Sequence, residues 1–217
     1  MRVAIIGGAG KIARLLLTRL VEDGHEVVSL ARREEQLAEL AQAGAEPRYL
    51  DIESADEAQW RDALAGADAV VFAAGGGPDG NAARKLTVDL GGSVSAIRTA
   101  EALGIRRFVQ VSAIGVDRPA DPSRGDVWVA YVEAKRDADE ELRRSTLDWT
   151  ILRPGSLTDA PAAGMVRLAP EVASGTVPRA DVAAVIAACL ADDRTIGRQW
   201  ELVSGDLSIV AAIDAAL

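Results

Sequence analysis

The sequence is poor in cysteine, aromatic residues and lysine. Its 217 residues include one cysteine, and Phe, Trp and Tyr together make up only 4%. A single cysteine excludes a disulfide within the chain, and Cys189 in the apolar run DVAAVIAACL is expected to be a buried structural thiol in a reducing compartment. The core must therefore be built mainly from aliphatic side chains.

The chain also lacks an excess of positive charge and any long apolar run. Its formal net charge of −9 argues against a nucleic-acid partner or an anionic membrane surface, although a local basic pocket for a small anion is compatible with it. No segment reaches membrane-spanning length, and the apolar stretch in MRVAIIGG is too short for a signal peptide. The lone histidine, His25, is expected to be structural, and no metal site is expected. Together these features predict a cytoplasmic protein.

Short apolar runs alternate with longer segments of helical period. The runs expected to form strands are RVAIIG, HEVVSLAR, AEPRYL, DAVVFAA, RRFVQVSA and LDWTILRPG. Such runs are typical of strands buried on both faces by flanking helices. The order predicts an α/β fold, a Rossmann-type doubly wound parallel sheet with helices on both faces, as a single domain over residues 1–217. One long helix is expected from Asn81 to Leu103, and helix ends are expected at Gly24, Gly44, Gly66 and Gly104.

Two connections contain more Gly and Pro than a turn requires. They follow the fifth and sixth predicted strands, at about residues 113–127 and 155–176. Ligands of doubly wound sheets bind beyond the carboxyl ends of strands. We therefore predict that these two segments are substrate loops.

A glycine-rich turn, GGAGKIA, follows the first predicted strand. Gly7, Gly10 and Ala13 have the spacing G-x-x-G-x-x-A and open the first predicted helix. The glycines allow a sharp turn and the approach of a pyrophosphate to the backbone, and the small Ala13 allows close packing of helix and strand. This strand-loop-helix context predicts a dinucleotide site, with Lys11 and Ile12 inside it.

The end of the second predicted strand bears on the choice of cofactor. An acidic residue there binds the ribose 2′-hydroxyl, whereas an arginine accommodates a 2′-phosphate. The sequence VVSLARR has no carboxylate and places Arg32 and Arg33 at this point. NADP(H) is therefore favoured over NAD(H), and the alternative is that Arg32 is a solvated residue at the start of the next helix.

Tyr131 and Lys135 are one helical turn apart in VAYVEAKRDADEEL. Residues i and i+4 share a face of a helix, so an ammonium group can lie beside the phenol and make it a better proton donor. The chain has only three lysines, Lys11, Lys85 and Lys135, against 21 arginines, and all three are expected on the carboxyl side of the sheet. The alternative is that Tyr131 packs on the core and Lys135 pairs with Asp139.

With these motifs in order, the sequence resembles the atypical short-chain dehydrogenase/reductases, and more narrowly the small NAD(P)H-binding proteins related to NmrA-like and epimerase-type members. The resemblance covers nearly the whole chain. It implies that Asp51 and Ile52 contact the adenine, and that the segment AAGGG, which begins with Ala73, Ala74 and Gly75, passes the ribose and pyrophosphate.

The resemblance also assigns residues at the reacting end. It implies that Ser112 orients the substrate, and that Arg153, Pro154 and Gly155 border the nicotinamide. Active members carry Asn where this chain has Asp89, which is expected to face Lys135 as a charged partner or to hold an ordered water.

These residues predict an NADPH-dependent oxidoreductase for a small carbonyl-type substrate. Tyr131 would deliver the proton, Lys135 would tune the phenol and bind the ribose, and Ser112 would hold the substrate oxygen. The alternatives are a non-catalytic NADP(H) sensor that binds a protein partner, and an NADP-dependent epimerase or isomerase. The sequence leaves the oligomeric state open.

Overall fold

The computed structural model describes residues 1–77 and 80–217. The strands are β1 (Arg2–Ile6), β2 (Glu26–Ala31), β3 (Glu46–Tyr49), β4 (Ala69–Phe72), β5 (Arg107–Val111), β6 (Asp148–Pro154), β7 (Ser156–Thr158), β8 (Met165–Ala169), β9 (Thr176–Pro178), β10 (Arg198–Ser204) and β11 (Leu207–Ser208). The α-helices are α1 (Lys11–Glu22), α2 (Glu34–Gln42), α3 (Glu57–Leu64), α4 (Ala82–Arg84), α5 (Ser93–Leu103), α6 (Asp126–Arg144), α7 (Arg179–Leu190) and α8 (Ile209–Ala216). The other helical segments are η1 (Lys85–Gly92), η2 (Pro122–Arg124) and η3 (Asp193–Thr195).

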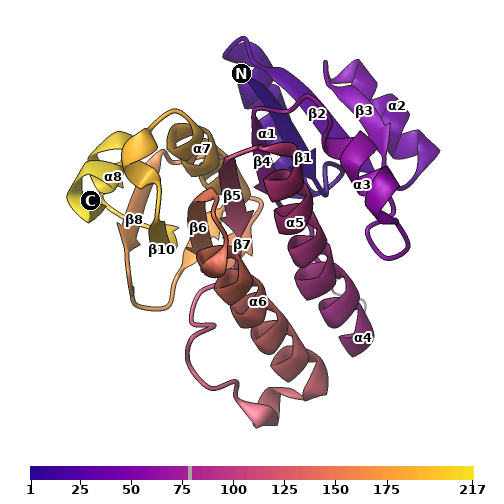
Figure 1. Ribbon diagram of the computed structural model, residues 1–217. Coiled ribbons are helices and arrows are strands. Elements are labelled where there is room, and N and C mark those ends of the chain that lie inside the picture. The colour runs from indigo at the N-terminus through magenta and orange to yellow at the C-terminus, as the bar shows by residue number, and fades with distance from the viewer. Residues whose placement is uncertain (78–79) are drawn as a thin grey trace.

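A nine-stranded sheet forms the centre of the molecule (Figure 1). Its order is β11-β8-β10-β6-β5-β4-β1-β2-β3. All neighbouring pairs from β10 to β3 are parallel, while β8 is antiparallel to both of its neighbours. The predicted doubly wound parallel sheet is thus confirmed.

Helices cover both faces of the sheet because the central strands are apolar on both sides. Along β1, Val3 and Ile5 join one hydrophobic cluster, and Ala4 and Ile6 join the other. The first cluster is covered by α1, α2, α7 and α8, and the second by α3, α5 and α6. Figure 1 shows α5 and α6 running side by side across the second face. The predicted helix-ending glycines, Gly24, Gly44, Gly66 and Gly104, all have left-handed φ angles.

The predicted continuous helix from Asn81 to Leu103 is interrupted. A single turn, α4, leads into the π-helical segment η1, and α5 follows it. Hydrogen bonds of a π-helix span five residues, and such segments are frequent at functional sites. Here η1 packs on α6 and buries the side chains of Lys85, Val88 and Asp89. Side-chain periodicity alone cannot distinguish this wider winding from an α-helix.

The segment at 155–176, predicted as a substrate loop, is not all loop, because it contains β7, β8 and the first residue of β9. β7 pairs with β9, and β8 joins the main sheet beside β10. Along β8, Val166 and Leu168 are buried while Met165 and Arg167 are exposed, the alternation of a strand buried on one face. The surrounding Gly and Pro residues concealed this short pattern. The predicted loop after β5 is present, with η2 near its end.

No helix in the described parts of the chain is both long enough and apolar enough to cross a membrane.

Candidate functional site

The turn between β1 and α1 has no space for a side chain at Gly7 and little at Gly10. Gly7 has φ +82°, and a Cβ atom there would lie 2.7 Å from Ala74 Cα. A Cβ on Gly10 would lie 3.1 Å from the Gly7 carbonyl oxygen. Gly10 is also the N-cap of α1 and has no side chain to cap the first-turn N–H groups. These groups therefore suit an anion, as the glycine spacing predicts.

The residues that follow Gly10 have different positions. Ile12 and Ala13 are buried in α1 and pack in the core, so only their backbone is available to a phosphate. Lys11 is exposed, and its Nζ atom is 2.5 Å from Asp159 Oδ2 in the segment after β7. In this state the ammonium of Lys11 is thus held by a carboxylate.

A cavity of about 560 Å³ opens at the carboxyl ends of β1, β2, β3 and β4. The predicted cofactor-binding residues that line it are Gly7, Gly10, Arg32, Arg33, Asp51, Ile52, Ala73, Ala74 and Gly75. Lys11, Ile12, Ala13, Ser112, Lys135, Pro154 and Gly155 are not among the described residues of its wall. The lining residues are those that the sequence predicts for the adenosine and phosphate half of a dinucleotide site.

The wall beside β2 and β3 is rich in arginine. Arg32, Arg33 and Arg84 line the cavity, against the carboxylates of Asp51 and Glu53. This local excess of cations lies in a chain with a net charge of −9. It is the basic pocket for a small anion that the overall charge leaves possible.

Sequence reasoning missed Glu53. The stretch VVSLARR at the end of β2 contains no carboxylate, but Glu53 Oε2 from the turn after β3 lies 3.2 Å from Arg32 Nη1. β2 and β3 are neighbouring parallel strands, so their carboxyl ends meet. The only available sign in the sequence was the position of Glu53, two residues after Asp51 in YLDIES.

Asp51 and Arg33 have local partners. Asp51 accepts hydrogen bonds from the Glu53 backbone N–H at 3.2 Å and from Ser54 Oγ at 3.1 Å, which fixes the turn after β3. Gln36 accepts hydrogen bonds from Arg33 when its amide is oriented with the oxygen toward the guanidinium. Both contacts define the cavity wall.

Lys135 is buried between η1 and the ends of β4 and β5. Its Nζ atom lies 3.2 Å from Asp89 Oδ1, 3.1 Å from the Val111 carbonyl oxygen and 3.5 Å from the Ala74 carbonyl oxygen. The two carbonyl oxygens accept hydrogen bonds from the ammonium group, and Asp89 forms a buried ion pair with it. The expected pairing of Asp89 with Lys135 is confirmed. The alternative pairing with Asp139 is wrong, because Asp139 lies in a separate network.

Asp89 also contacts the backbone that passes the cofactor site. Its Oδ2 atom accepts a hydrogen bond from the Gly76 N–H at 2.8 Å, and a Cβ on Gly75 would approach Asp89 Oδ1 to 3.1 Å. Asp89 therefore ties the segment after β4 to the lysine of α6.

The phenol of Tyr131 lies in the field of these charges. Burial raises the pKa of Tyr131, Lys135 acts in the opposite direction, and Asp89 and Asp139 add to the rise. Burial alone would lower the pKa of Lys135, but the charges around it, Asp89 first, outweigh burial and the net direction is upward. At neutral pH the arrangement therefore holds a protonated phenol beside a charged ammonium.

Aromatic and cationic groups surround Tyr131. The Trp128 ring centroid is 5.7 Å from that of Tyr131, and Lys85 Nζ lies 5.8 Å from the Tyr131 centroid. Lys85 also donates a hydrogen bond to the Gly77 carbonyl oxygen. Two of the three lysines of the chain thus lie near this tyrosine.

Ser112 belongs to a buried polar network. Its hydroxyl donates to Asp139 Oδ2 at 2.8 Å, and the same oxygen accepts from Arg153 Nε at 2.8 Å. Asp139 Oδ1 accepts from Gln110 Nε2 at 2.8 Å. The guanidinium of Arg153 also binds Asp117 in the segment after β5, which holds the pKa of Asp117 below its usual range.

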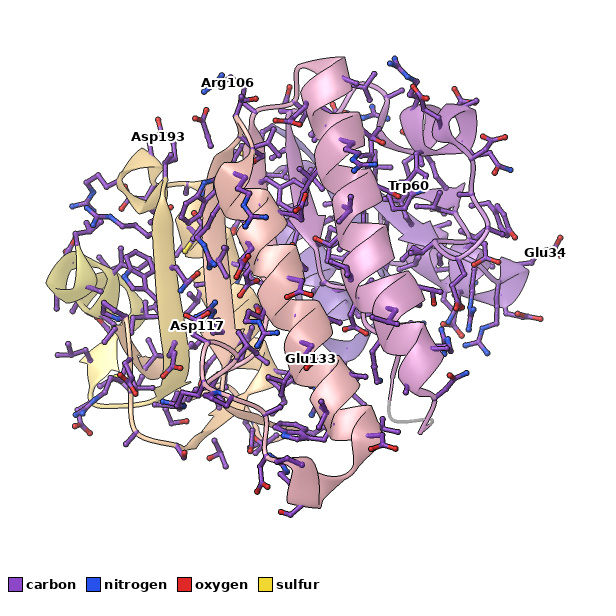
Figure 2. All side chains as sticks on the ribbon, turned by 60° about the horizontal axis from the view of Figure 1, so that its bottom comes forward. Glu34, Trp60, Arg106, Asp117, Glu133 and Asp193 are labelled. Carbon is purple, nitrogen blue, oxygen red and sulfur yellow. The ribbon has the colours of Figure 1, made fainter. Side chains whose placement is uncertain are left out.

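The residues after Arg153 hold the ends of the strands. The Pro154 carbonyl accepts from the Ile114 N–H at 3.0 Å, and the Gly155 N–H donates to the Leu202 carbonyl at 2.8 Å. Asp117 follows β5 and is labelled in Figure 2. It lies well away from Arg106 and Asp193, which are at the amino ends of the strands. Ser112, Pro154 and Gly155 thus lie together at the carboxyl ends of β5 and β6.

Known proteins are similar to this chain over nearly its whole length. A family model described as NAD(P)H-binding matches residues 7–193. The protein named uncharacterized sugar epimerase YhfK from Bacillus subtilis strain 168 is 36% identical, over 98% of this chain and 99% of its own. A solved structure titled putative NAD-dependent epimerase/dehydratase from Bacillus halodurans is 40% identical, covers 99% of both chains and has a TM-score of 0.90. The structure of the oxidoreductase ylbE from Lactococcus lactis is 28% identical, covers 99% of this chain and 96% of its own, and has a TM-score of 0.87.

Proposed function

The chain belongs to the NAD(P)H-binding family of oxidoreductase-like and epimerase-like Rossmann proteins, and on that basis we propose that it is an NADPH-dependent reductase of a small carbonyl-type substrate. The proposal has two parts, the choice of NADPH and the direction of the reaction. Each is supported by a different half of the site.

The position of Tyr131 carries the proposal of a reductase. Tyr131 lies on α6 one helical turn before the buried Lys135, and Lys85 Nζ is 5.8 Å from its ring centroid. Reduction of a carbonyl requires a proton donor for the oxygen, and a neutral phenol beside an ammonium group is such a donor. A phenol keeps its proton at neutral pH, and burial raises the pKa of Tyr131 further. A tyrosine that acts as a base would instead need a lowered pKa.

The neighbouring residues have distinct roles in this proposal. Bound NADPH would supply the hydride. Tyr131 would donate its proton to the substrate oxygen, and Lys135 would favour the resulting phenolate. Ser112 would rotate its hydroxyl from Asp139 to the substrate oxygen, and Asp139 would keep its hydrogen bonds from Gln110 and Arg153.

The arginines of the cavity support the choice of NADPH. Arg32 lies at the end of β2, where a 2′-phosphate is recognised in Rossmann folds. Arg33 and Arg84 line the same wall. Guanidinium groups form strong, directional hydrogen bonds with phosphate oxygens.

The experiment screens the purified protein with NADPH against a panel of quinones, aldehydes, ketones and flavins. For any acceptor that is reduced, Tyr131→Phe should lower kcat/KM by about 10²-fold, because a positioned general acid is lost. NADPH affinity should stay nearly unchanged. Tyr49→Phe is the matched control, since Tyr49 is the other tyrosine and lies exposed on β3. Equal turnover of Tyr131→Phe and the parent would contradict the assignment.

An epimerase is the second candidate, because two of the similar proteins carry epimerase names. An epimerase that regenerates its cofactor shows no net NADPH consumption and is expected to retain the cofactor through purification. Tight NADPH binding with neither reduction nor epimerisation would instead favour a redox sensor. The hydrogen bonds from Lys135 to the Val111 and Ala74 carbonyl oxygens support the sensor, because they engage the ammonium group that would bind the ribose.

A further inference from the structure

Glu53 lies inside the arginine cluster of the cavity. Its Oε2 atom is 3.2 Å from Arg32 Nη1 and 3.2 Å from Arg84 Nε. Its Oε1 atom accepts a hydrogen bond from Thr87 Oγ1 at 2.8 Å. These residues come from the end of β2, from the turn after β3, and from the continuous stretch of α4 and η1. One carboxylate therefore joins three stretches of the chain.

A carboxylate between two guanidinium groups occupies the kind of position that a phosphate takes. Both anions present oxygen atoms that pair with arginine donors. A ribose 2′-phosphate that binds Arg32 must displace Glu53 from it or remain close to a like charge. A 2′-hydroxyl has the opposite requirement, because a carboxylate at this position accepts its hydrogen bond.

We propose that Glu53 is a specificity-determining residue for the 2′ position of the cofactor. Its carboxylate competes with a 2′-phosphate for Arg32 and Arg84, and it accepts a hydrogen bond from the 2′-hydroxyl of the unphosphorylated cofactor. The inference rests on the proposed binding of the cofactor's adenosine half in this cavity. It goes beyond the proposed NADPH preference by naming the residue that opposes it.

A merely structural role for Glu53 makes a different prediction. If Glu53 only anchors the turn after β3 to η1, its loss would change the affinity for phosphorylated and unphosphorylated ligands alike. The test therefore uses two ligands that differ only in the 2′-phosphate, namely 2′,5′-ADP and 5′-AMP. Neither ligand requires turnover.

The experiment measures both dissociation constants by titration calorimetry on the parent, Glu53→Gln and Glu57→Gln. The amide introduced by Glu53→Gln is not charged but keeps an oxygen that can accept from Thr87, so the substitution removes mainly the charge. The ratio of the 5′-AMP to the 2′,5′-ADP dissociation constant should rise by about tenfold or more in Glu53→Gln, as charge-assisted contacts with phosphate become available. Glu57→Gln makes the same change of charge on the exposed first turn of α3, where Glu57 pairs with Arg61, and should leave the ratio unchanged.

Each result has a defined meaning. An unchanged ratio in Glu53→Gln, or equal weakening of both ligands, would overturn the inference. If Glu53→Gln fails to fold, Glu53→Ser replaces it, with a rise of the ratio again expected. A parent that prefers 5′-AMP would overturn the proposed NADPH preference, but the change of ratio between parent and variant would still decide the role of Glu53.

Discussion

The proposed adenosine half and the proposed catalytic half of the site lie along one edge of the sheet but differ in the exposure of their ion pairs. In the Arg32–Glu53 pair of the cavity wall the side chains are 49% and 27% exposed. In the Lys11–Asp159 pair, which lies outside that wall at the start of α1, they are 67% and 58% exposed. In the Lys135–Asp89 pair the exposed fractions are 7% and 1%, and in the Arg153–Asp139 pair they are 2% and 0%. The first two pairs are thus solvated, and the Lys135–Asp89 and Arg153–Asp139 pairs are buried.

This difference indicates what each half is built to do. Exposed ion pairs contribute little to stability, so an incoming phosphate can replace one partner at small cost. Buried charges must be fully partnered, and removal of one partner leaves the other uncompensated. The adenosine half thus suits exchange of ligands, and the catalytic half suits a fixed geometry around Tyr131.

The largest effect is expected from Asp139→Asn in the catalytic half. Both oxygens of Asp139 accept hydrogen bonds, so an amide nitrogen would face a donor from Gln110 or from Ser112 and Arg153. Loss of one partner of a buried ion pair costs about 3–5 kcal/mol in the free energy of unfolding. Urea denaturation measures the change. The control is Asp137→Asn on the same helix, a half-exposed residue expected to change stability by about 0.5 kcal/mol at most. Equal effects of the two substitutions would remove the distinction between the halves.

The next effect is expected from Arg32→Ala in the adenosine half. Loss of a charge-assisted hydrogen bond of about 1.5–3 kcal/mol should weaken NADPH binding by about one to two decades. NADH affinity and the free energy of unfolding should change little, because Arg32 is half exposed. Fluorescence titration with both cofactors measures the ratio, and Arg19→Ala on the exposed face of α1 is the control. Equal affinities of the parent for NADPH and NADH would contradict this role of Arg32.

Asp89→Asn should have a smaller effect on stability and a clear effect on pH dependence. The amide oxygen can still lie beside Lys135, but the buried ammonium loses its counter-charge, so the cost in the free energy of unfolding is about 3 kcal/mol, the low end for a buried ion pair. Asp89 contributes to the raised pKa of Tyr131, so its neutralisation lowers that pKa. A general acid works below its pKa, and the alkaline limb of kcat/KM should therefore move to lower pH. An unmoved limb would show that Tyr131 does not feel Asp89 or is not the acid.

Much of the fold could be predicted from the sequence because the central strands are apolar runs separated by helices with glycine ends. The departures occur where local signals are weak. β8 is short and flanked by Gly and Pro, and η1 has the same residue types as an α-helix. Both are stabilised by tertiary contacts, with β10 and with α6 respectively, which local propensity does not contain.

The site could be predicted where a residue's role depends on its own backbone. Gly7 and Gly10 are examples, because their spacing fixes the turn. Partners from other segments could not be predicted from spacing. Glu53 reaches Arg32 across neighbouring strands, and Asp139 binds Ser112 and not Lys135 because α6 lies over the end of β5.

The smallest effect is expected from Asp159→Asn, which tests the more exposed of the two solvated pairs compared above. The hydrogen bond from Lys11 is the main cause of the lowered pKa of Asp159, so at neutral pH the carboxylate is ionised and holds the ammonium. Neutralising it frees Lys11 for the cofactor phosphates and should tighten NADPH binding by about two- to threefold, within the range of exposed ion pairs. The gain should shrink as salt is added, because exposed charges are screened. The gain in NADPH affinity should be complete above the ordinary pKa of an aspartate. It should vanish as the pH falls through the lowered pKa of Asp159, because the parent carboxyl group then becomes neutral as well.

Titrations of the parent and Asp159→Asn with NADPH at low and high salt measure the effect, and the denaturation midpoint should not move. A gain independent of salt, or a large loss of stability, would mean that this pair behaves like the buried ones.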